Sequence, residues 1–221
     1  MTPHVNPEVW ALRPDFVALS LVVRGGRNET RGADVEGPAR PAERPSWANA
    51  HLEAWREAYR AFGAKQQRTP CSAEALWKRV ERNGALASIN AVVDLYNEVS
   101  LRYAVPVGGE DLSAYAGVPR LVRAVGDEPF LTTRDGEPVV EALEAGEVIW
   151  RDDRGVTCRR WNWRQTPRTR LDVASTDMWF ILERLDPMPL EALVEAGHML
   201  AAGLRRLAPN AQITNELLRP G

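Results

Sequence analysis

The chain has 221 residues, of which 44% are hydrophobic and 26% are charged, and its formal net charge is −2. This length and composition are those of a globular protein with a sizeable core, and they exclude a disordered chain. The small net charge argues against a protein that coats nucleic acid, and no apolar run approaches the ~20 residues that a membrane-spanning helix needs.

The first part of the chain predicts one strand followed by two helices. Residues 16–23 are rich in Val and Leu and predict a buried strand, whereas residues 32–45 combine Gly, Pro, Glu and Arg without periodicity and predict a surface loop. An amphipathic helix is expected over residues 47–63, with Ser46 as its N-cap. A shorter helix is expected over residues 72–83, where an Asn-Gly pair follows its last apolar position.

The clearest helical pattern covers residues 89–103. An apolar stripe there follows the 3.6-residue period and predicts a buried face. Beside it, Asn90, Asp94 and Asn97 form a polar stripe at i, i+4 and i+7. These short polar side chains either line a pocket or cap loops and fix the neighbouring backbone. The apolar stripe consists of Ile89, Val92, Val93, Tyr96, Val99, Ser100 and Tyr103.

After this helix the pattern becomes β-like. Pro106 and the Gly108–Gly109 pair predict a loop, and Asp135–Gly136 predicts a hairpin turn farther along the chain. Residues 188–207 predict a closing amphipathic helix. This order predicts one α+β domain over residues 1–221, with a mixed, mostly antiparallel β region flanked by helices. The expected strands are residues 121–125, 130–132, 148–152, 156–161 and 178–185.

No standard catalytic signature is present. The chain has no phosphate-binding loop, no Gly-x-Ser-x-Gly and no His-Glu-x-x-His, and its three histidines are far apart in sequence. Cys71 and Cys158 have neither metal nor redox spacing, so we expect no metal and no cofactor. Because the N-terminus also lacks a signal-peptide pattern, we expect a cytoplasmic protein with reduced thiols.

Arginine is concentrated in residues 151–171, which contain seven arginines and only two aspartates. Arginines beside Trp161 and Trp163 can contact phosphates and stack on nucleic-acid bases. Alternatively, their aliphatic stems cover apolar surface on a solvated hairpin. Since the two tryptophans alternate on the expected strand, both are expected on the same side of it.

A longer composite pattern extends over residues 83–186. It comprises a helix reading Ile-Asn-Ala-Val-Val-Asp-Leu-Tyr-Asn over residues 89–97, then Pro106, Asp111, Asp135–Gly136, Gly-Glu-Val-Ile over residues 146–149, Thr176 and Leu182–Glu183. This order and spacing resembles the editing (B3/B4-type) domain of the phenylalanyl-tRNA synthetase β chain. In that domain an Ile-Asn-Asn-Val-Val-Asp-x-Thr-Asn helix runs into a Gln-Pro-Leu-His-Ala-Phe-Asp loop. A Leu-Asp-Gly hairpin, a Val-Ile-x-Asp strand and a Thr…Leu-Glu strand follow it.

The resemblance implies a B3/B4-like fold and a freestanding protein that hydrolyses the ester of mischarged aminoacyl-tRNA, with the tRNA acceptor end as its partner. Three features depart from the family pattern. Gly108 stands where the family has histidine, residues 159–163 replace Gly-Val-Met-Gly-Gly, and the 188–207 helix stands where the family has a Thr-Glu-Ala-Ser-His-like stretch. The synthetase domain's preference for removing tyrosine therefore cannot be carried over to this chain. A non-catalytic module that binds tRNA or an amino acid is the alternative function.

We expect the site where the end of the 89–103 helix meets the 106–111 loop and the strand carrying Glu183. Gly108 and Gly109 either offer backbone amides to an oxyanion or form a tight turn, and Asp111 either orients water or caps a turn. Glu183 lies in an apolar run, where a carboxylate is costly to bury unless it is paired, so it is either functional or bonded to an arginine. The candidate catalytic residues are Glu183, Gly108, Gly109 and Asp111. The candidate substrate-binding residues are Asn97, Ser100, Arg160, Trp161 and Thr176, and the candidate tRNA-binding residues are Arg159, Arg164 and Arg168.

Overall fold

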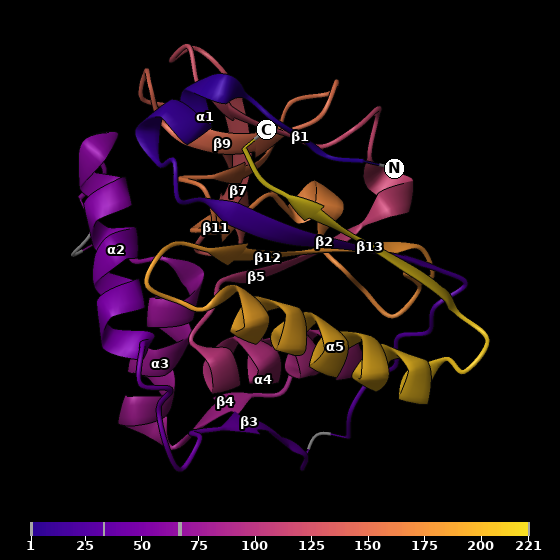
Figure 1. Ribbon diagram of the computed structural model, residues 1–221. Helices are drawn as coiled ribbons and strands as arrows, with labels where there is room; N and C mark the ends of the chain where they lie inside the picture. Colours follow the sequence, from indigo (N-terminus) through magenta and orange to yellow (C-terminus); the bar gives the residue numbers. More distant parts are fainter. Residues whose placement is uncertain (1, 33, 66–67, 221) are drawn as a thin grey trace.

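The middle layer of the fold is a four-stranded antiparallel sheet in the order β13-β2-β12-β5 (Figure 1). The computed structural model describes residues 2–32, 34–65 and 68–220. In it, β12 pairs with β2 from the start of the chain and with β5 from its middle, so the sheet joins segments far apart in sequence. The four strands are β2 (Val17–Arg24), β5 (Val107–Asp111), β12 (Met178–Arg184) and β13 (Gln212–Leu218).

One face of this sheet is covered by α4 (Ala91–Tyr103) and α5 (Leu190–Leu207), which lie below it in Figure 1. The approach of α5 is close because residue 197 is a glycine. A Cβ atom at Gly197 would lie 2.1 Å from Leu19 Cδ2 on β2, closer than packed atoms come.

The other face packs against a five-stranded sheet in the order β1-β6-β9-β10-β11. Its β1–β6 pair is parallel, and its other pairs are antiparallel. A large aromatic core lies between the two sheets and includes Trp150, Trp161 and Trp179. The strands are β1 (His4–Val5), β6 (Arg120–Arg123), β9 (Val148–Arg151), β10 (Val156–Arg159) and β11 (Arg164–Gln165).

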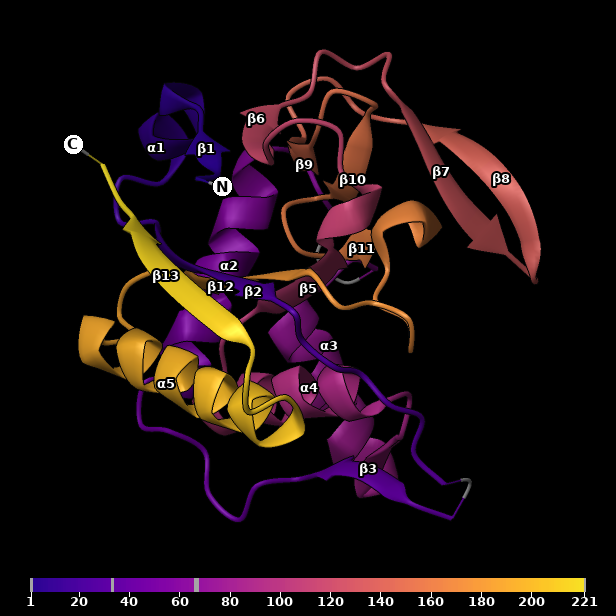
Figure 2. The same cartoon turned by 90° about the vertical axis from the view of Figure 1, so that its right-hand side faces the viewer.

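The remaining elements surround these layers. Helices α2 and α3 lie at the left end of the sheets in Figure 1, and the β7–β8 hairpin projects to the right in Figure 2. None of the described helices is long and apolar enough to span a membrane. The elements are α1 (Pro7–Leu12), β3 (Glu36–Ala39), α2 (Ala48–Ala61), α3 (Ser72–Asn83), β4 (Ala85–Ala87), β7 (Pro129–Arg134) and β8 (Glu137–Ala142).

The run of apolar residues in β12 follows from burial on both faces. Side chains alternate across a strand, so Phe180 and Leu182 pack on the helices while Trp179 and Ile181 enter the core between the sheets. Glu183 belongs to this second set and is 1% exposed. The sequence pattern therefore places a carboxyl group between two apolar layers.

The start of α4 corrects one expectation. Asn90 is the N-cap, and its side-chain oxygen accepts a hydrogen bond from the Val93 amide. Ile89 lies before the helix and is 63% exposed, so the expected burial of Ile89 is wrong. The buried stripe begins at Val92.

Other local expectations need correction. Within residues 32–45, the expected loop contains β3, which pairs with β4; residue 33 lies outside the described part. Ser46 is not the N-cap of α2, because that position is held by Trp47 without a side-chain cap. Residues 107–111 form β5 rather than a loop, since they pair with β12 throughout.

The expected strand over residues 156–161 ends early. Arg160 and Trp161 have φ values of 50° and 63°, so the chain turns sharply after Arg159. The Asn162 amide donates to the carbonyl of Arg160, which closes a γ-turn around Trp161. Trp161 and Trp163 therefore do not alternate on one strand, and the expectation that they share a side is wrong.

Candidate functional site

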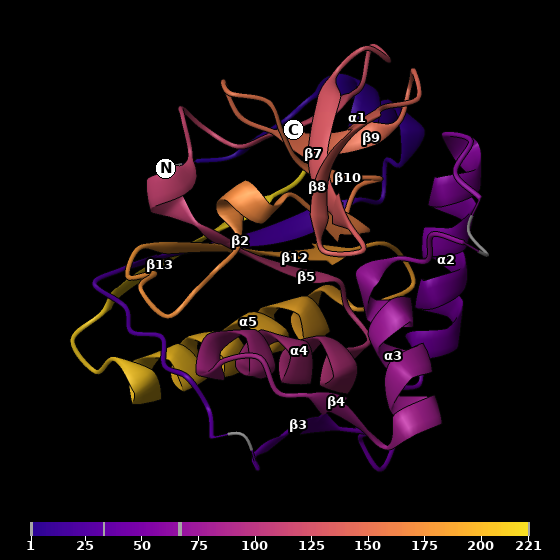
Figure 3. The ribbon, with the colours of Figure 1, turned by 180° about the vertical axis from the view of Figure 1, so that it is seen from behind.

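A partly open cavity of about 220 Å³ lies at the edge of the middle sheet, between the two sheets and the helices α3 and α4. Figure 3 shows the elements that meet there, with β5 and β12 above α4 and α3 beside them. The cavity is large enough for an amino-acid side chain, since a cavity of about 150 Å³ accepts benzene. Its lining includes Ser72, Asn97, Gly108, Glu110, Trp150, Cys158, Trp161, Asn162, Trp163, Arg164, Ile181 and Glu183.

Glu183 is held in the cavity wall by two donors. Trp150 Nε1 donates to Glu183 Oε1 at 3.0 Å, and Asn162 Nδ2 donates to Glu183 Oε2 at 3.0 Å. The Asn162 amide is itself oriented, because its oxygen accepts from the Tyr59 hydroxyl at 2.9 Å and from the Ser72 amide at 3.3 Å. This chain of bonds fixes the carboxyl group from α2, α3 and β9.

Burial raises the pKa of Glu183 to about 8. The hydrogen bonds from Asn162 and Trp150 and the nearby Trp161 indole act in the opposite direction, and the nearby Glu110 carboxylate adds to the rise. Removing a carboxylate from water is costly when no cation accompanies it. Glu183 forms no ion pair with any residue that the structure describes, so the expected salt bridge to an arginine is wrong.

Glu110 supplies a second buried carboxyl from β5, and it is 5% exposed. The Tyr115 hydroxyl donates to Glu110 Oε2. Burial raises the pKa of Glu110 to about 7, although the bond from Tyr115 and the nearby Thr169 hydroxyl lower it. Two carboxyl groups with raised pKa values thus border one cavity, an arrangement typical of functional sites.

Two polar atoms in the cavity lining lack partners. Trp161 Nε1 and Ser72 Oγ are buried, and neither has a hydrogen-bond partner within the described residues. Trp161 is also held in a left-handed backbone conformation that a bulky side chain adopts at a cost. Unpaired buried polar groups and local backbone strain are both features that occur at functional sites.

The outer rim of the cavity is basic and aromatic. The Arg164 guanidinium lies 4.2 Å from the Trp163 ring centroid, and that of Arg160 lies 4.8 Å from it. Arg79 on α3 is exposed on the same rim. Such a rim suits a phosphate-bearing ligand whose apolar end enters the cavity.

The structure brings six of the predicted site residues to this cavity: Asn97, Gly108, Gly109, Trp161, Arg164 and Glu183. The cavity therefore lies where the end of the helix, residues 106–111 and the Glu183 strand were expected to meet. Asn90 and Asp94 do not line the cavity. Asn90 caps α4, and Asp94 accepts hydrogen bonds from the Ser88 hydroxyl and the Ile89 amide.

Gly108 and Gly109 do not form a glycine turn. Glu183 N donates to Pro106 O, and bonded pairs recur at every second residue in an antiparallel ladder. The Gly108 amide is therefore directed at Ile181 rather than at the cavity. Gly109 is required for packing, because a Cβ atom there would lie 2.8 Å from Tyr96 Cε1.

Three predicted site residues form contacts away from the cavity. Asp111 caps a turn and accepts from the Ser113 amide at 2.8 Å. Ser100 is fully buried, and its hydroxyl donates to Val105 O at 2.6 Å. Thr176 is exposed, and its carbonyl accepts from the Gly26 amide. None of the three lines the cavity.

Most of the arginine segment is internally paired. Arg159 is 4% exposed and bonds Glu147 and Glu141, so it is not available to a phosphate. Arg168 holds both oxygens of the buried Asp152 at 2.9 Å. Arg160 lies 3.6 Å from Glu147 Oε2. Only Arg164, of the four arginines considered, lines the cavity.

The sequence did not indicate several residues of the site. They belong to the site only because tertiary packing brings β9, α2, α3 and the turn after β10 to Glu183. These residues are Trp150, Tyr59, Ser72 and Asn162. Of these residues, only Asn162 had a feature that could have indicated it from the sequence: it is a polar residue between two tryptophans, next to a segment expected to be a strand.

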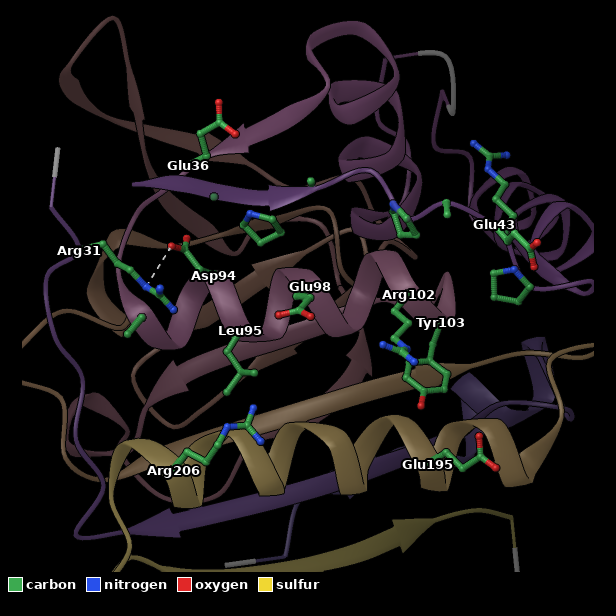
Figure 4. Close-up of a pocket in the computed structure, with 18 of the residues that line it drawn as sticks. Arg31, Glu36, Glu43, Asp94, Leu95, Glu98, Arg102, Tyr103, Glu195 and Arg206 are labelled. Atoms are coloured by element: carbon green, nitrogen blue, oxygen red, sulfur yellow. Dashed lines mark ion pairs between the residues drawn. The ribbon is translucent and has the colours of Figure 1, made fainter. Parts of the chain in front are cut away.

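A larger and more open groove of about 930 Å³ lies between Arg31, the segment 36–47 and the helices α4 and α5. Figure 4 shows charged side chains of both signs along it, including Glu98, Arg102 and Arg206. These three side chains are exposed, and the buried Asp94 in its wall is already bonded. We place the candidate site in the smaller cavity, which is less open than the groove and has aromatic walls and unpaired buried groups.

Comparison with known proteins supports this fold. The model of the B3/4 domain family matches residues 54–193. The chain is similar to the crystal structure of an N-terminal fragment of the phenylalanyl-tRNA synthetase β-subunit from Pyrococcus horikoshii, with a TM-score of 0.50 and 11% identity. The similarity covers 99% of this chain and 54% of that chain, so this chain spans about half the fragment's length. No curated protein matches. The expected B3/B4-type domain and its α+β fold are confirmed.

Proposed function

Because the chain belongs to the B3/4 domain family, we propose that it hydrolyses the ester bond of a mischarged aminoacyl-tRNA, with the amino-acid side chain held in the cavity beside Glu183. The proposal places the protein in the cytoplasm, where aminoacyl-tRNA is used. The observation that supports it is the cavity of about 220 Å³ with two buried carboxyl groups in its wall.

The size and lining of the cavity support an amino-acid ligand. Synthetases discriminate between similar side chains by only about 1–3 kcal/mol, so a second hydrolytic site is chemically useful. Trp150, Ile181 and Trp161 supply apolar contact, and Glu183 supplies a polar group at a fixed position. A ligand of this kind is recognised by shape and by a few polar groups.

The rim supports a nucleotide at the other end of the ligand. An aminoacyl ester joins an amino acid to a ribose, so a side chain in the cavity brings the terminal nucleotide to Asn97, Arg164 and Arg79. Arg164 and Arg79 carry positive charge on that rim. These residues replace the wider arginine set expected from sequence, most of which is engaged in ion pairs.

Hydrolysis requires one water molecule and the transfer of one proton. The water oxygen bonds to the carbonyl carbon, the bond from that carbon to the ribose oxygen breaks, and the ribose oxygen takes a proton. A carboxyl group whose pKa lies near neutrality can exchange a proton at this step, and the pKa of Glu110 is raised to about 7. Positioning of the ester and the water in the cavity supplies much of the remaining acceleration.

One observation favours a binding module instead. The Gly108 amide is directed at Ile181 in the sheet, so it is not an oxyanion donor, and the family's histidine is absent at this position. A protein without these groups can retain an aminoacyl end without hydrolysing it. This alternative predicts a stable complex with aminoacyl-tRNA.

A panel of tRNAs carrying different radiolabelled amino acids separates the two functions. The hydrolase releases free amino acid from at least one of them, in single-turnover conditions, faster than the uncatalysed reaction. The binding module protects or retains the aminoacyl-tRNA without release. Neither turnover nor binding with any tRNA in the panel would contradict both.

A further inference from the structure

The acidic groups of the cavity have no internal cation. Glu183 and Glu110 face it from the neighbouring strands β12 and β5, and neither forms an ion pair with a described residue. The buried Arg159 and the partly buried Arg168 are already paired, Arg159 with Glu147 and Arg168 with Asp152. Arg79 and Arg164 lie on the rim, where their charged ends reach solvent.

The donors around Glu183 suit an ionised carboxylate. Trp150 Nε1 and Asn162 Nδ2 can only donate, and each bonds a different oxygen of Glu183. Trp161 Nε1 is a third donor on the same cavity and has no described partner. This arrangement is prepared for a negative charge that burial alone disfavours.

The walls of the cavity also favour a cation. Trp150 and Trp161 line it, and a positive group over a tryptophan face is attracted by the negative face of the ring. A buried cation beside two carboxyl groups satisfies both sides of the ion pair, which neither side achieves alone.

We propose that the cavity binds the cationic end of an amino-acid side chain, an ammonium or guanidinium group, between Glu183, Glu110 and the tryptophan walls. The inference rests on the proposed function, because it names the class of amino acid that enters the site. The cavity volume of about 220 Å³ leaves room for the methylene stem of such a side chain.

Binding of a cation is expected to release protons. A cation favours the ionised form of Glu183 and Glu110, so its affinity rises with pH until both groups are ionised. The other titratable or charged groups that face these carboxyls are Tyr59 on α2, Cys158 on β10, Tyr115, Asp152 and Arg168. Burial raises the pKa values of Tyr59, Cys158 and Tyr115, and Asp152 and Arg168 pair with each other. The two glutamates therefore determine how the affinity for a cation changes between pH 6 and pH 8.

The test uses the wild-type chain and two nearly isosteric probes. L-lysine methyl ester and L-norleucine methyl ester share the α-amino and ester groups and differ in the terminal ammonium. Binding is followed by tryptophan fluorescence, since three tryptophans line the cavity. We expect lysine methyl ester to bind at least tenfold more tightly, and we expect this ratio to grow from pH 6 to pH 8.

Variants and a third probe sharpen the result. Glu183→Gln is expected to reduce the lysine-to-norleucine ratio, and Glu110→Gln provides the same test on the other strand if the first variant folds poorly. L-tyrosine methyl ester tests recognition of a hydroxyl group instead. Equal or tighter binding of the norleucine or tyrosine ester, or no binding of any ester, would overturn the inference.

The deacylation panel separates this inference from the proposed function. Hydrolysis of a tRNA carrying a neutral amino acid, together with no preference for the lysine ester, would sustain the hydrolase and overturn the cation site. Tight binding of the lysine ester without hydrolysis of any aminoacyl-tRNA would sustain the cation site and contradict the hydrolase.

Discussion

A carboxyl group that is buried without a cation favours its neutral form, and Glu183 is such a group. Its pKa is raised from an ordinary 4.5 to about 8 by burial. The stability associated with the neutral form is complete below pH 4.5 and is lost as pH rises through 8. Each pKa unit corresponds to about 1.4 kcal/mol, so the loss amounts to several kcal/mol over this range.

Glu183→Gln removes this titration while keeping the shape of the side chain. Relative to the wild type, the variant's free energy of unfolding is expected to rise progressively from pH 5 to pH 8.5. Urea unfolding at both pH values measures the difference. Parallel pH profiles of the two proteins would show that Glu183 ionises normally in the folded chain.

The same variant tests the role of Glu183 in turnover. If Glu183 contacts the aminoacyl group or the attacking water, single-turnover deacylation falls by about 10²-fold or more, the usual scale for a positioned acid or base. A thermal melt is the folding control. Asn97→Ala is expected mainly to weaken binding of the aminoacyl end. Full activity of both variants, with unchanged melting, would place the reaction elsewhere.

His51 is a structural histidine despite its chemistry. Trp55 Nε1 and the Leu185 amide both donate to His51 Nε2, so Nδ1 carries the proton and donates to Ala104 O at 2.9 Å. Burial lowers the pKa of His51 to about 4. Because the folded pKa lies below the unfolded value, the associated stability is lost as pH falls from 6.5 towards 4.

His51→Ala leaves the Trp55 indole, the Leu185 amide and the Ala104 carbonyl without partners. Each buried unpaired group costs about 1–3 kcal/mol, so the variant is expected to melt well below the wild type at pH 7. Its stability should also depend less on pH between 6.5 and 5. Wild-type melting together with a wild-type pH profile would show that these bonds contribute little.

At the scale of elements, α4 shows what periodicity predicts and what it misses. The apolar stripe correctly indicates the face that packs on the middle sheet, because burial follows the 3.6-residue period. The predicted stripe also includes Ile89, which lies outside the helix because Asn90 is the N-cap. Helix boundaries depend on cap geometry more than on hydrophobicity.

A pair of substitutions on α4 tests this boundary. Val93 is 6% exposed and packs between α4 and the middle sheet, so Val93→Asp buries an unpaired charge and is expected to cost about 3–5 kcal/mol. Ile89→Asp at a 63% exposed position should change stability by about 0.5 kcal/mol or less. Equal destabilisation in urea would contradict this placement of the helix start.

The elements that the sequence did not predict are those created by tertiary pairing. β5 contains two glycines, which weigh against a strand locally, yet pairing with β12 overrides that preference. The turn at Arg160–Trp161 places two bulky residues at positive φ, where sequence rules expect glycine. Glu183, Asn97 and the position of the cavity were predictable because polarity inside apolar runs is a local signal. Asn162 and Trp150 were not, because their roles depend on contacts between distant segments.

The arginine segment supports a test with an internal control. Arg164 on the rim is expected to contact phosphate, so Arg164→Gln should flatten the dependence of log affinity for tRNA on log salt by about 0.7–0.9. Arg168 bonds the buried Asp152, so Arg168→Gln should lower stability and leave the salt slope unchanged. Filter binding across a salt series measures both slopes. A slope lowered by Arg168→Gln alone would reverse this assignment.

At the scale of the whole molecule, the middle sheet links the start, middle and end of the chain. β2 lies between β12 and β13, and β12 lies between β2 and β5, so neither half of the sequence holds a complete sheet. The family match begins at residue 54, after β2. We therefore propose that residues preceding the match belong to the same domain, which the sequence alone also predicts.

Cooperative unfolding tests this organisation. Six of the eight tryptophans belong to or contact the core between the two sheets, whereas α4 and α5 lie on the other side of the middle sheet. Tryptophan fluorescence thus reports mainly on this core, whereas circular dichroism reports on helices of both sides, because α2 packs in the core and α4 and α5 pack on the other face of the sheet. One domain predicts coincident urea transitions by both probes. It also predicts that Val93→Asp, which lies on the helical side, lowers both midpoints equally. Two separate transitions, of which Val93→Asp lowers only the one followed by circular dichroism, would show that the layers fold as independent units.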